Sequence, residues 1–163
     1  MMLDYTLVTT KATYRPLNPV DIPAFIHLVT RRHREELSRE ALPAERVLAF
    51  LEELHHHKDR GALLVFEVEE SLAGYALLRP RWCMEQGGPE LAIEELYVVP
   101  EQRARDIAAD FLELLRKVAP QDIRRILLEA PRADRKGMDA CRKLGFKDTG
   151  RVILSLDVEG DKQ

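Results

Sequence analysis

The chain has 163 residues, of which 45% are hydrophobic and 33% charged, and its formal net charge is −3. This length suffices to bury the core of one domain, predicted over residues 1–163, without disulfides or metals. The acidic total, with no basic stripe between aromatic residues, argues against nucleic-acid binding. No apolar run approaches the roughly 20 residues that span a bilayer. We therefore expect a soluble protein with no nucleic-acid or membrane partner.

The cysteines and the first residues bear on cellular location. Cys83 and Cys141 lie far apart in sequence, a usage typical of a reduced protein. The first ten residues, MMLDYTLVTT, lack the basic and apolar regions of a secretory signal. A cytoplasmic location is expected.

The first third of the chain predicts an extended segment and two helices. Leu3–Tyr14 alternates loosely and predicts an edge strand or arm. Asp21 is a candidate N-cap for a helix whose apolar residues recur at helical spacing. The charged cluster Arg31–Glu36 lies on the same helix, either as a gate at a substrate mouth or, the favoured alternative, as a solvated helix end. Pro43–His57 predicts the second helix.

Three consecutive histidines, His55–His57, end that second helix and raise the question of a metal site. Successive helix positions point about 100° apart, so three neighbours do not converge on one ion. Cationic side chains at a helix C-terminus give the better explanation. No metal site is predicted.

The middle of the chain predicts three strands. Ala62–Val68 and Leu72–Leu78 read as a hairpin, in which Gly74 marks a bulge or a close backbone approach. Arg79–Pro89 is predicted to be a loop. It leads into an apolar central strand, Leu91–Val99, which the following proline ends.

Helices and strands then alternate. The pattern predicts a helix over Ile107–Val118, a strand over Ile123–Glu129, a helix over Ala133–Leu144 and a last strand over Val152–Val158. The full order is β-α-α-β-β-β-α-β-α-β. It predicts an α/β fold of the α+β type, with a mixed sheet whose opening meander is followed by a parallel crossover.

Acids and bases gather where the central strand meets the next helix. Glu94 and Glu95 interrupt the apolar strand, and Arg103 and Arg105 lie in the turn. A basic turn at a helix N-terminus suits an anion. Residues 101–150 also carry 12 Lys and Arg against 9 Asp and Glu. That imbalance fits an anionic ligand, although ordinary charged helix surfaces are the favoured explanation.

Two stretches resemble the GNAT superfamily of acyl-CoA-dependent N-acyltransferases, and the similarity extends over nearly the whole chain. IEELYVVPEQRARDI resembles the family's fourth strand and pyrophosphate loop, and ACRKLGF resembles its late helix-to-strand corner. The resemblance implies a GNAT-like fold and transfer of an acetyl group from acetyl-CoA to an amine of a small molecule or peptide. It leaves the oligomeric state open, a homodimer included.

The resemblance also implies which residues contact the acyl donor. They are Tyr97, Val98, Val99, Arg103, Ala104, Arg105, Asp106, Ile107 and Ala108. The family's loop pattern, Gln/Arg-x-x-Gly-x-Gly/Ala, is met at Arg103 and Ala108 but broken at Asp106, where glycine is expected. Its carboxylate should cap the helix and repel the phosphates. The alternative function is therefore a catalytically degenerate GNAT-fold binding or regulatory module.

Catalytic roles follow from the same resemblance. Glu94 falls where family members place a general base, and Glu95 takes a secondary role; alternatively, these acids line an edge or pair with arginine. Cys141 stands where a tyrosine general acid is often found, although a buried core cysteine is the favoured interpretation. Asp134 replaces an asparagine and is a natural helix N-cap.

Overall fold

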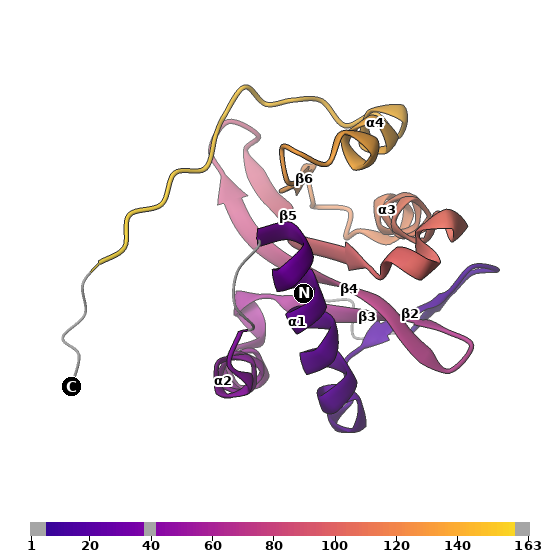
Figure 1. Cartoon of the computed structure of the whole chain (residues 1–163). Helices are drawn as coiled ribbons and strands as arrows, with labels where there is room; N and C mark the ends of the chain where they lie inside the picture. The colour runs from indigo at the N-terminus through magenta and orange to yellow at the C-terminus, as the bar shows by residue number, and fades with distance from the viewer. Residues whose placement is uncertain (1–5, 38–41, 159–163) are drawn as a thin grey trace.

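Residues 6–37 and 42–158, which the computed structural model describes, form a six-stranded mixed sheet with helices packed against it (Figure 1). The strands are β1 (Leu7–Val8), β2 (Thr13–Pro16), β3 (Ala62–Val68), β4 (Ser71–Cys83), β5 (Gly88–Val98) and β6 (Arg125–Leu128). The helices are α1 (Ile22–Leu37), α2 (Ala44–His56), α3 (Ile107–Val118) and α4 (Arg135–Lys143). Three short 3-10 turns complete the set: η1 (Pro19–Asp21), η2 (Lys58–Arg60) and η3 (Pro100–Arg105). None of the described helices is long and apolar enough to cross a membrane.

The strand order is β1-β2-β3-β4-β5-β6, and every neighbouring pair is antiparallel except β5 and β6. A tight turn at Glu69 and Glu70 makes the β3–β4 hairpin, with φ angles of 51° and 62°. The parallel pair needs a long crossover, which α3 supplies. This confirms the predicted mixed sheet, with its meander first and its parallel crossover second.

Aromatic side chains show which helix covers which face of the sheet. Tyr14 and Phe66 are register partners on β2 and β3, and both pack against Phe111 of α3. Successive strand residues face opposite sides, so Tyr75, which pairs with the residue before Phe66, lies on the other face. There it contacts Phe25 of α1 at 5.1 Å between ring centroids. The core therefore lies on both faces of the sheet.

Gly74 confirms the predicted close approach of two strands. A Cβ atom at this position would lie 2.3 Å from the backbone oxygen of Tyr97 on β5. Any side chain there would push β4 and β5 apart.

The predicted bounds of two segments are wrong, one near the N-terminus and one in the middle of the chain. The segment predicted as an edge strand or arm over Leu3–Tyr14 contains β1 and the start of β2, while residues 1–5 lie outside the described part. The predicted loop Arg79–Pro89 is largely a long β4–β5 hairpin. Arg81 and Glu90 stand opposite each other in it and form an ion pair, so charged residues extend the ladder that composition alone would end.

The predicted last strand, Val152–Val158, is also not formed in the described structure. These residues have no regular secondary structure and all are exposed. In Figure 1 the segment runs away from the sheet. Its pattern suits a strand, but a strand also needs a partner edge, and periodicity carries no information about that partner.

Candidate active site

The centre of the candidate site is a bulge in β5. Leu77 of β4 stands opposite Glu95 and Leu78 opposite Ile93, so Glu94 is an extra residue without a partner in the register. A bulge re-aims side chains and occurs often beside active sites. It falls on the acid that the sequence comparison singles out as a base.

The bulge turns both acids toward the face that α1 and α2 cover. Arg79 donates from Nε to Glu94 at 2.8 Å, and the Arg79 guanidinium lies 5.8 Å from the ring centre of Phe50 on α2. Tyr75 donates its hydroxyl to Glu95 at 2.7 Å, and Arg32 of α1 forms an ion pair with the same carboxylate. The two carboxylates are therefore held side by side on one face.

These contacts favour the alternative in which the strand acids pair with arginine. The side chain of Glu94 is 37% exposed and that of Glu95 is 32% exposed, so neither is enclosed in apolar surroundings. Glu94 interrupts a strand in which Ile93, Tyr97 and Val98 are buried, and the bulge turns it to a partly open, charged position.

Strands β5 and β6 separate just beyond the bulge. They pair in parallel from Glu90 to Ile93, and the amide of Glu129 donates to the Ile93 carbonyl at 3.0 Å. From Glu94 onward, no strand pairs with β5 on that side within the described residues. The two strands therefore diverge at Glu94, and the backbone edge that this leaves unpaired on β5 is called the slot below.

Glu129 is a site carboxylate that the sequence reading missed. Burial and the neighbouring charge of Glu94 raise the pKa of Glu129 above its usual range. Glu129 is the last residue of the predicted strand over Ile123–Glu129. Its position at that strand end, next to the slot, was the feature of the sequence that could have indicated it. That signal gains meaning only when β6 is known to lie beside the bulge.

The charged cluster near the end of α1 is not a solvated helix end as favoured. Tyr97 of β5 donates its hydroxyl to Glu35 at 2.8 Å, and Arg103 donates from Nη2 to Glu35 at 2.6 Å. Arg31 forms a double hydrogen bond with Glu101. Burial and Glu35 raise the pKa of the Tyr97 hydroxyl. The cluster thus joins α1 to the end of β5 and to η3.

Asp106 stands at the junction of η3 and α3 in a left-handed conformation, with φ 56° and ψ 33°. Glycine adopts this conformation without cost, whereas other residues rarely do. The glycine of the family pattern is therefore explained by backbone geometry. The predicted cap is wrong, because the Asp106 side chain makes no capping hydrogen bond. Its carboxylate is exposed.

The start of α3 offers backbone donors. The first helical hydrogen bond runs from the Asp110 amide to the Asp106 carbonyl at 3.0 Å. The amides of residues 107–109 precede it, and such amides have no partner within a helix. They give this helix end a partial positive charge that suits an anion.

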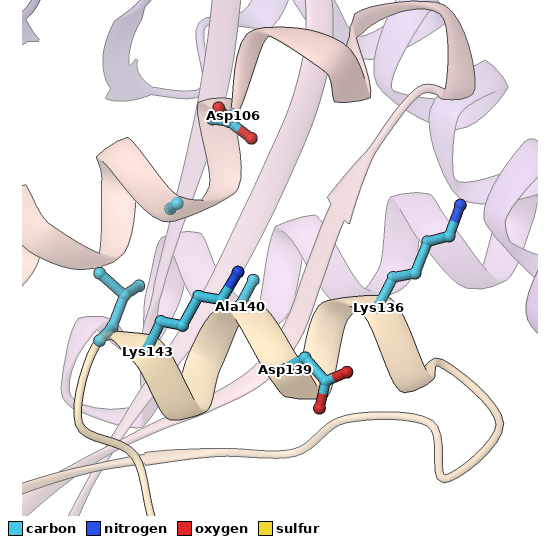
Figure 2. Close-up of a pocket in the computed structure, with 7 residues that line it drawn as sticks. Asp106, Lys136, Asp139, Ala140 and Lys143 are labelled. Atoms are coloured by element: carbon cyan, nitrogen blue, oxygen red, sulfur yellow. The ribbon is translucent and has the colours of Figure 1, made fainter.

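A pocket of about 530 Å³ lies between this helix end and α4. Asp106, Lys136 and Lys143 contribute its charged lining, together with Asp139. Figure 2 shows the two lysine side chains extending from α4 on the side of α3. Asp139 is paired with Arg142 at 2.7 Å, which offsets its charge. The lysines come from a segment 30 residues or more along the chain, so the loop pattern could not indicate them.

Four of the nine residues assigned to the acyl donor are buried. Tyr97, Val98, Val99 and Ile107 are each less than 8% exposed and belong to the core. Ala108 packs against the same core, whereas Arg103, Ala104, Arg105 and Asp106 are exposed. Any contact with a donor through the buried residues would use backbone atoms. Arg105 is paired with Glu69 of the β3–β4 turn at 3.0 Å.

Cys141 on α4 is half-buried and packs against the hydrophobic core. Burial and the charge of Asp134 raise the pKa of its thiol. Asp134 accepts a hydrogen bond from the Gly137 amide at 2.9 Å, which confirms it as the N-cap of α4. No group of three or more His, Cys, Asp or Glu side chains that could hold a metal ion occurs in residues 6–37 and 42–158.

Comparison with known families assigns the chain. Residues 22–146 match the acetyltransferase (GNAT) family. The chain belongs to this family. The match contains the bulge, η3 and the start of α3. A search of curated proteins finds no significant match.

Solved structures with the same fold include several GNAT proteins. A possible acetyltransferase from Clostridium difficile 630 has a TM-score of 0.76 at 14% identity, covering 90% of this chain and 97% of its own. Ribosomal-protein-alanine N-acetyltransferase from Brucella melitensis biovar Abortus 2308 has a TM-score of 0.70 at 18% identity, covering 90% and 99%. A predicted acetyltransferase from Clostridium acetobutylicum, solved with acetyl-CoA, has a TM-score of 0.67 at 21% identity, covering 90% and 96%. At these identities the likeness establishes the fold.

Proposed function

We propose that this GNAT protein is an N-acetyltransferase that moves an acetyl group from acetyl-CoA to an amine of a small molecule or peptide. The observation that carries the proposal is the bulge at Glu94, placed where β5 and β6 separate and on the strand that leads through η3 to the N-terminus of α3. The segment from β5 to α3 thus carries a carboxylate, an unpaired strand edge and a helix end suited to an anion.

The residues present fit acetyl-CoA as the acyl donor. Amides of residues 107–109 and the ammonium groups of Lys136 and Lys143 are suited to its phosphates. The slot beside Glu94 is suited to the arm that ends in the thioester, because the open edge of β5 offers backbone hydrogen-bonding groups. When bound, acetyl-CoA supplies an activated acyl group that an amine can attack.

Glu94 is the proposed proton acceptor. An amine is protonated at neutral pH and must lose a proton before it can attack a carbonyl carbon. Glu94 is the first residue that β6 leaves unpaired, and Arg79 fixes the orientation of its carboxylate. Glu95 is the proposed secondary acid, held by Tyr75 and Arg32, and its charge attracts a cationic acceptor.

The alternative of a binding or regulatory module has specific support. Arg103 and Arg105, the two arginines of the turn, are paired with Glu35 and Glu69, and Asp106 adds a negative charge at the helix end. These pairings oppose phosphate binding. In each of the two ion pairs, one side chain is at least half exposed, and an exposed ion pair contributes little to stability. A phosphate can therefore replace either glutamate.

Calorimetric titration with acetyl-CoA tests the proposal, with Lys143→Ala as the site variant and Lys147→Ala as the matched control. We expect wild type to bind at a dissociation constant on the order of micromolar. Lys143→Ala should bind about fivefold more weakly, for the loss of one charge near a phosphate. The exposed Lys147 lies outside the pocket, so its variant should bind as wild type does.

A second measurement follows the thiol released from acetyl-CoA in the presence of peptides with a free N-terminus and of small primary amines. Turnover with any of them supports the enzyme. If acetyl-CoA does not bind at all, the enzyme proposal fails and the binding module is preferred. A cytoplasmic location remains a prediction.

A further inference from the structure

A groove of about 510 Å³ lies between the first half of α1 and the end of the β3–β4 hairpin. Its lining also includes Arg15 of β2, residues of η1, and Glu101 and Gln102 of η3. We call it the hairpin groove. It shares no residue with the pocket between α3 and α4, and neither Glu94 nor Glu95 lines it. Its volume is within the range of small-molecule sites.

The most buried charges of the hairpin groove share one arginine. Arg15 donates from Nη1 to Asp21 at 2.7 Å and from Nε to Glu67 at 2.9 Å. Asp21 is 9% exposed, yet the hydrogen bond from Arg15 outweighs burial and holds the pKa of its carboxyl below the usual range. One cation thus faces two carboxylates, and this group of three side chains keeps one surplus negative charge.

A further acid adds to this surplus at the tip of the hairpin. Glu70 lines the groove, and within residues 6–37 and 42–158 no side chain pairs with it. Its neighbour Glu69 is instead paired with Arg105 of η3. The other charged residues of the lining, Arg31 and Glu101, pair with each other. With histidine counted as neutral, two arginines against four acids give the lining a formal charge of −2. Three side chains that only joined β2, β3 and η1 would not need Glu70.

Aliphatic side chains complete the lining of the groove. Val20 of η1 is 85% exposed, and Ala24 of α1 and Leu72 of β4 are also accessible to solvent. A ligand chain that covers these side chains gains the free energy of removing apolar surface from water. The hairpin groove therefore combines an excess of negative charge with an apolar wall.

We infer that the hairpin groove binds a small organic cation, in which an ammonium or guanidinium group is carried on a short aliphatic chain. Carboxylates and such cations form charge-assisted hydrogen bonds, which are stronger than neutral ones. The charged head lies at Glu67 and Glu70, and the chain lies against Val20 and Leu72. The groove is separate from the proposed acetyl-transfer site, so the inference does not depend on the proposed function.

Binding of n-butylguanidinium tests the inference, with butyrate as an anionic probe that also carries a short aliphatic chain. In an NMR titration followed through the backbone amides, the cation should shift the signals of Ser71 and Gln102 until they saturate, with a dissociation constant on the order of 1 mM or below. Butyrate should not. Glu70→Gln should weaken binding of the cation about fivefold, for the loss of one charge near the ligand. Because Glu70 is exposed, this variant should still fold.

Two further variants separate the hairpin groove from other acids. Glu113→Gln makes the same change of charge at an exposed position of α3 outside the groove, and it should bind the cation as wild type does. Glu94→Gln should also retain binding. Absence of saturable shifts in the wild-type protein, equal binding of butyrate, or wild-type binding by Glu70→Gln overturns the inference. A loss in Glu113→Gln as large as that in Glu70→Gln also overturns it, as does loss of binding in Glu94→Gln, which would place the cation at the strand acids.

Discussion

Strand β5 divides at Ile93 into a half that is paired on both sides and a half that is paired on one. In the first half, Glu90 is fully buried between β4 and β6 and is held by Arg81 and Arg125. In the second half, Glu94 is partly open and is the first residue that β6 leaves unpaired. Two glutamates on one strand thus have different surroundings.

The difference shows that the residue type alone does not decide the role of a strand carboxylate. Burial raises the pKa of Glu90, but hydrogen bonds with Cys83, Arg81 and Arg125 outweigh it, so that pKa lies below its usual range. Glu90 therefore joins three strands as a structural ion. Glu94 has one arginine and an open side, which leaves room for a substrate.

The largest expected effect is on turnover and belongs to the second half. Glu94→Gln should lower kcat by roughly 10²–10⁴-fold at neutral pH, the range for a positioned base. Steady-state kinetics with an identified acceptor checks this, and the melting temperature should stay close to that of wild type. Unchanged turnover would remove Glu94 from the mechanism and would leave no functional difference between the two halves of β5.

The second effect is on stability and belongs to the first half. Glu90→Gln should lower the free energy of unfolding by about 1–3 kcal/mol, since hydrogen bonds to a charged group are worth that much. Denaturant unfolding measures it. At denaturant concentrations too low to unfold the protein, Glu90→Gln should retain its turnover. Glu90→Gln should therefore lose stability but keep turnover, whereas Glu94→Gln should lose turnover but keep stability.

Acid sharpens the same comparison. Since the folded pKa of Glu90 is lowered, its carboxylate contributes stability above the ordinary pKa near 4.5 and loses it as pH falls through the folded value. The stability gap between wild type and Glu90→Gln should therefore be constant at neutral pH and shrink below about pH 4.5. A stability gap between wild type and Glu90→Gln that persists at lower pH would mean that packing, not charge, stabilises the first half of β5.

The third effect concerns the turn that follows the second half. Asp106→Gly should tighten acetyl-CoA binding by about 1–3 kcal/mol, or roughly 5–150-fold, and by more than Asp106→Asn does. Stability should stay within about 1 kcal/mol of wild type, because relief of the left-handed backbone offsets the lost charge at the helix end. Calorimetry and thermal unfolding measure the two quantities. Equal binding by all three proteins would refute the repulsion.

The smallest expected effect is on stability, and it should show that Cys141 has a structural role, as Glu90 does. Cys141→Ala should cost about 1 kcal/mol of stability, typical of a point mutant, and leave turnover intact. The half-buried thiol packs on the core, which gives the stability term. A large loss of turnover in a folded variant would assign the general-acid role to this cysteine.

The sequence by itself determined the local structure of most of the fold. The strand patterns, the helix periods, the β3–β4 hairpin, the parallel crossover through α3 and the N-cap Asp134 follow from spacing and turn chemistry within a few residues. The family resemblance, carried by the run through Glu94 and Arg103, was confirmed by the match over residues 22–146. The local structure and the family resemblance both depend on residues that are neighbours in the chain, so the sequence alone was enough to predict them.

The tertiary structure decided the rest, because each feature depends on residues distant in the chain. Strict alternation places Glu94 and Glu95 on opposite faces, and only pairing with β4 reveals the bulge that turns them to one. Lys136 and Lys143 line the same pocket as Asp106 because α4 lies beside α3, and Glu35 reaches Arg103 because α1 crosses β5. The segment 152–158 has the pattern of a strand, but a strand forms only where another backbone offers an edge.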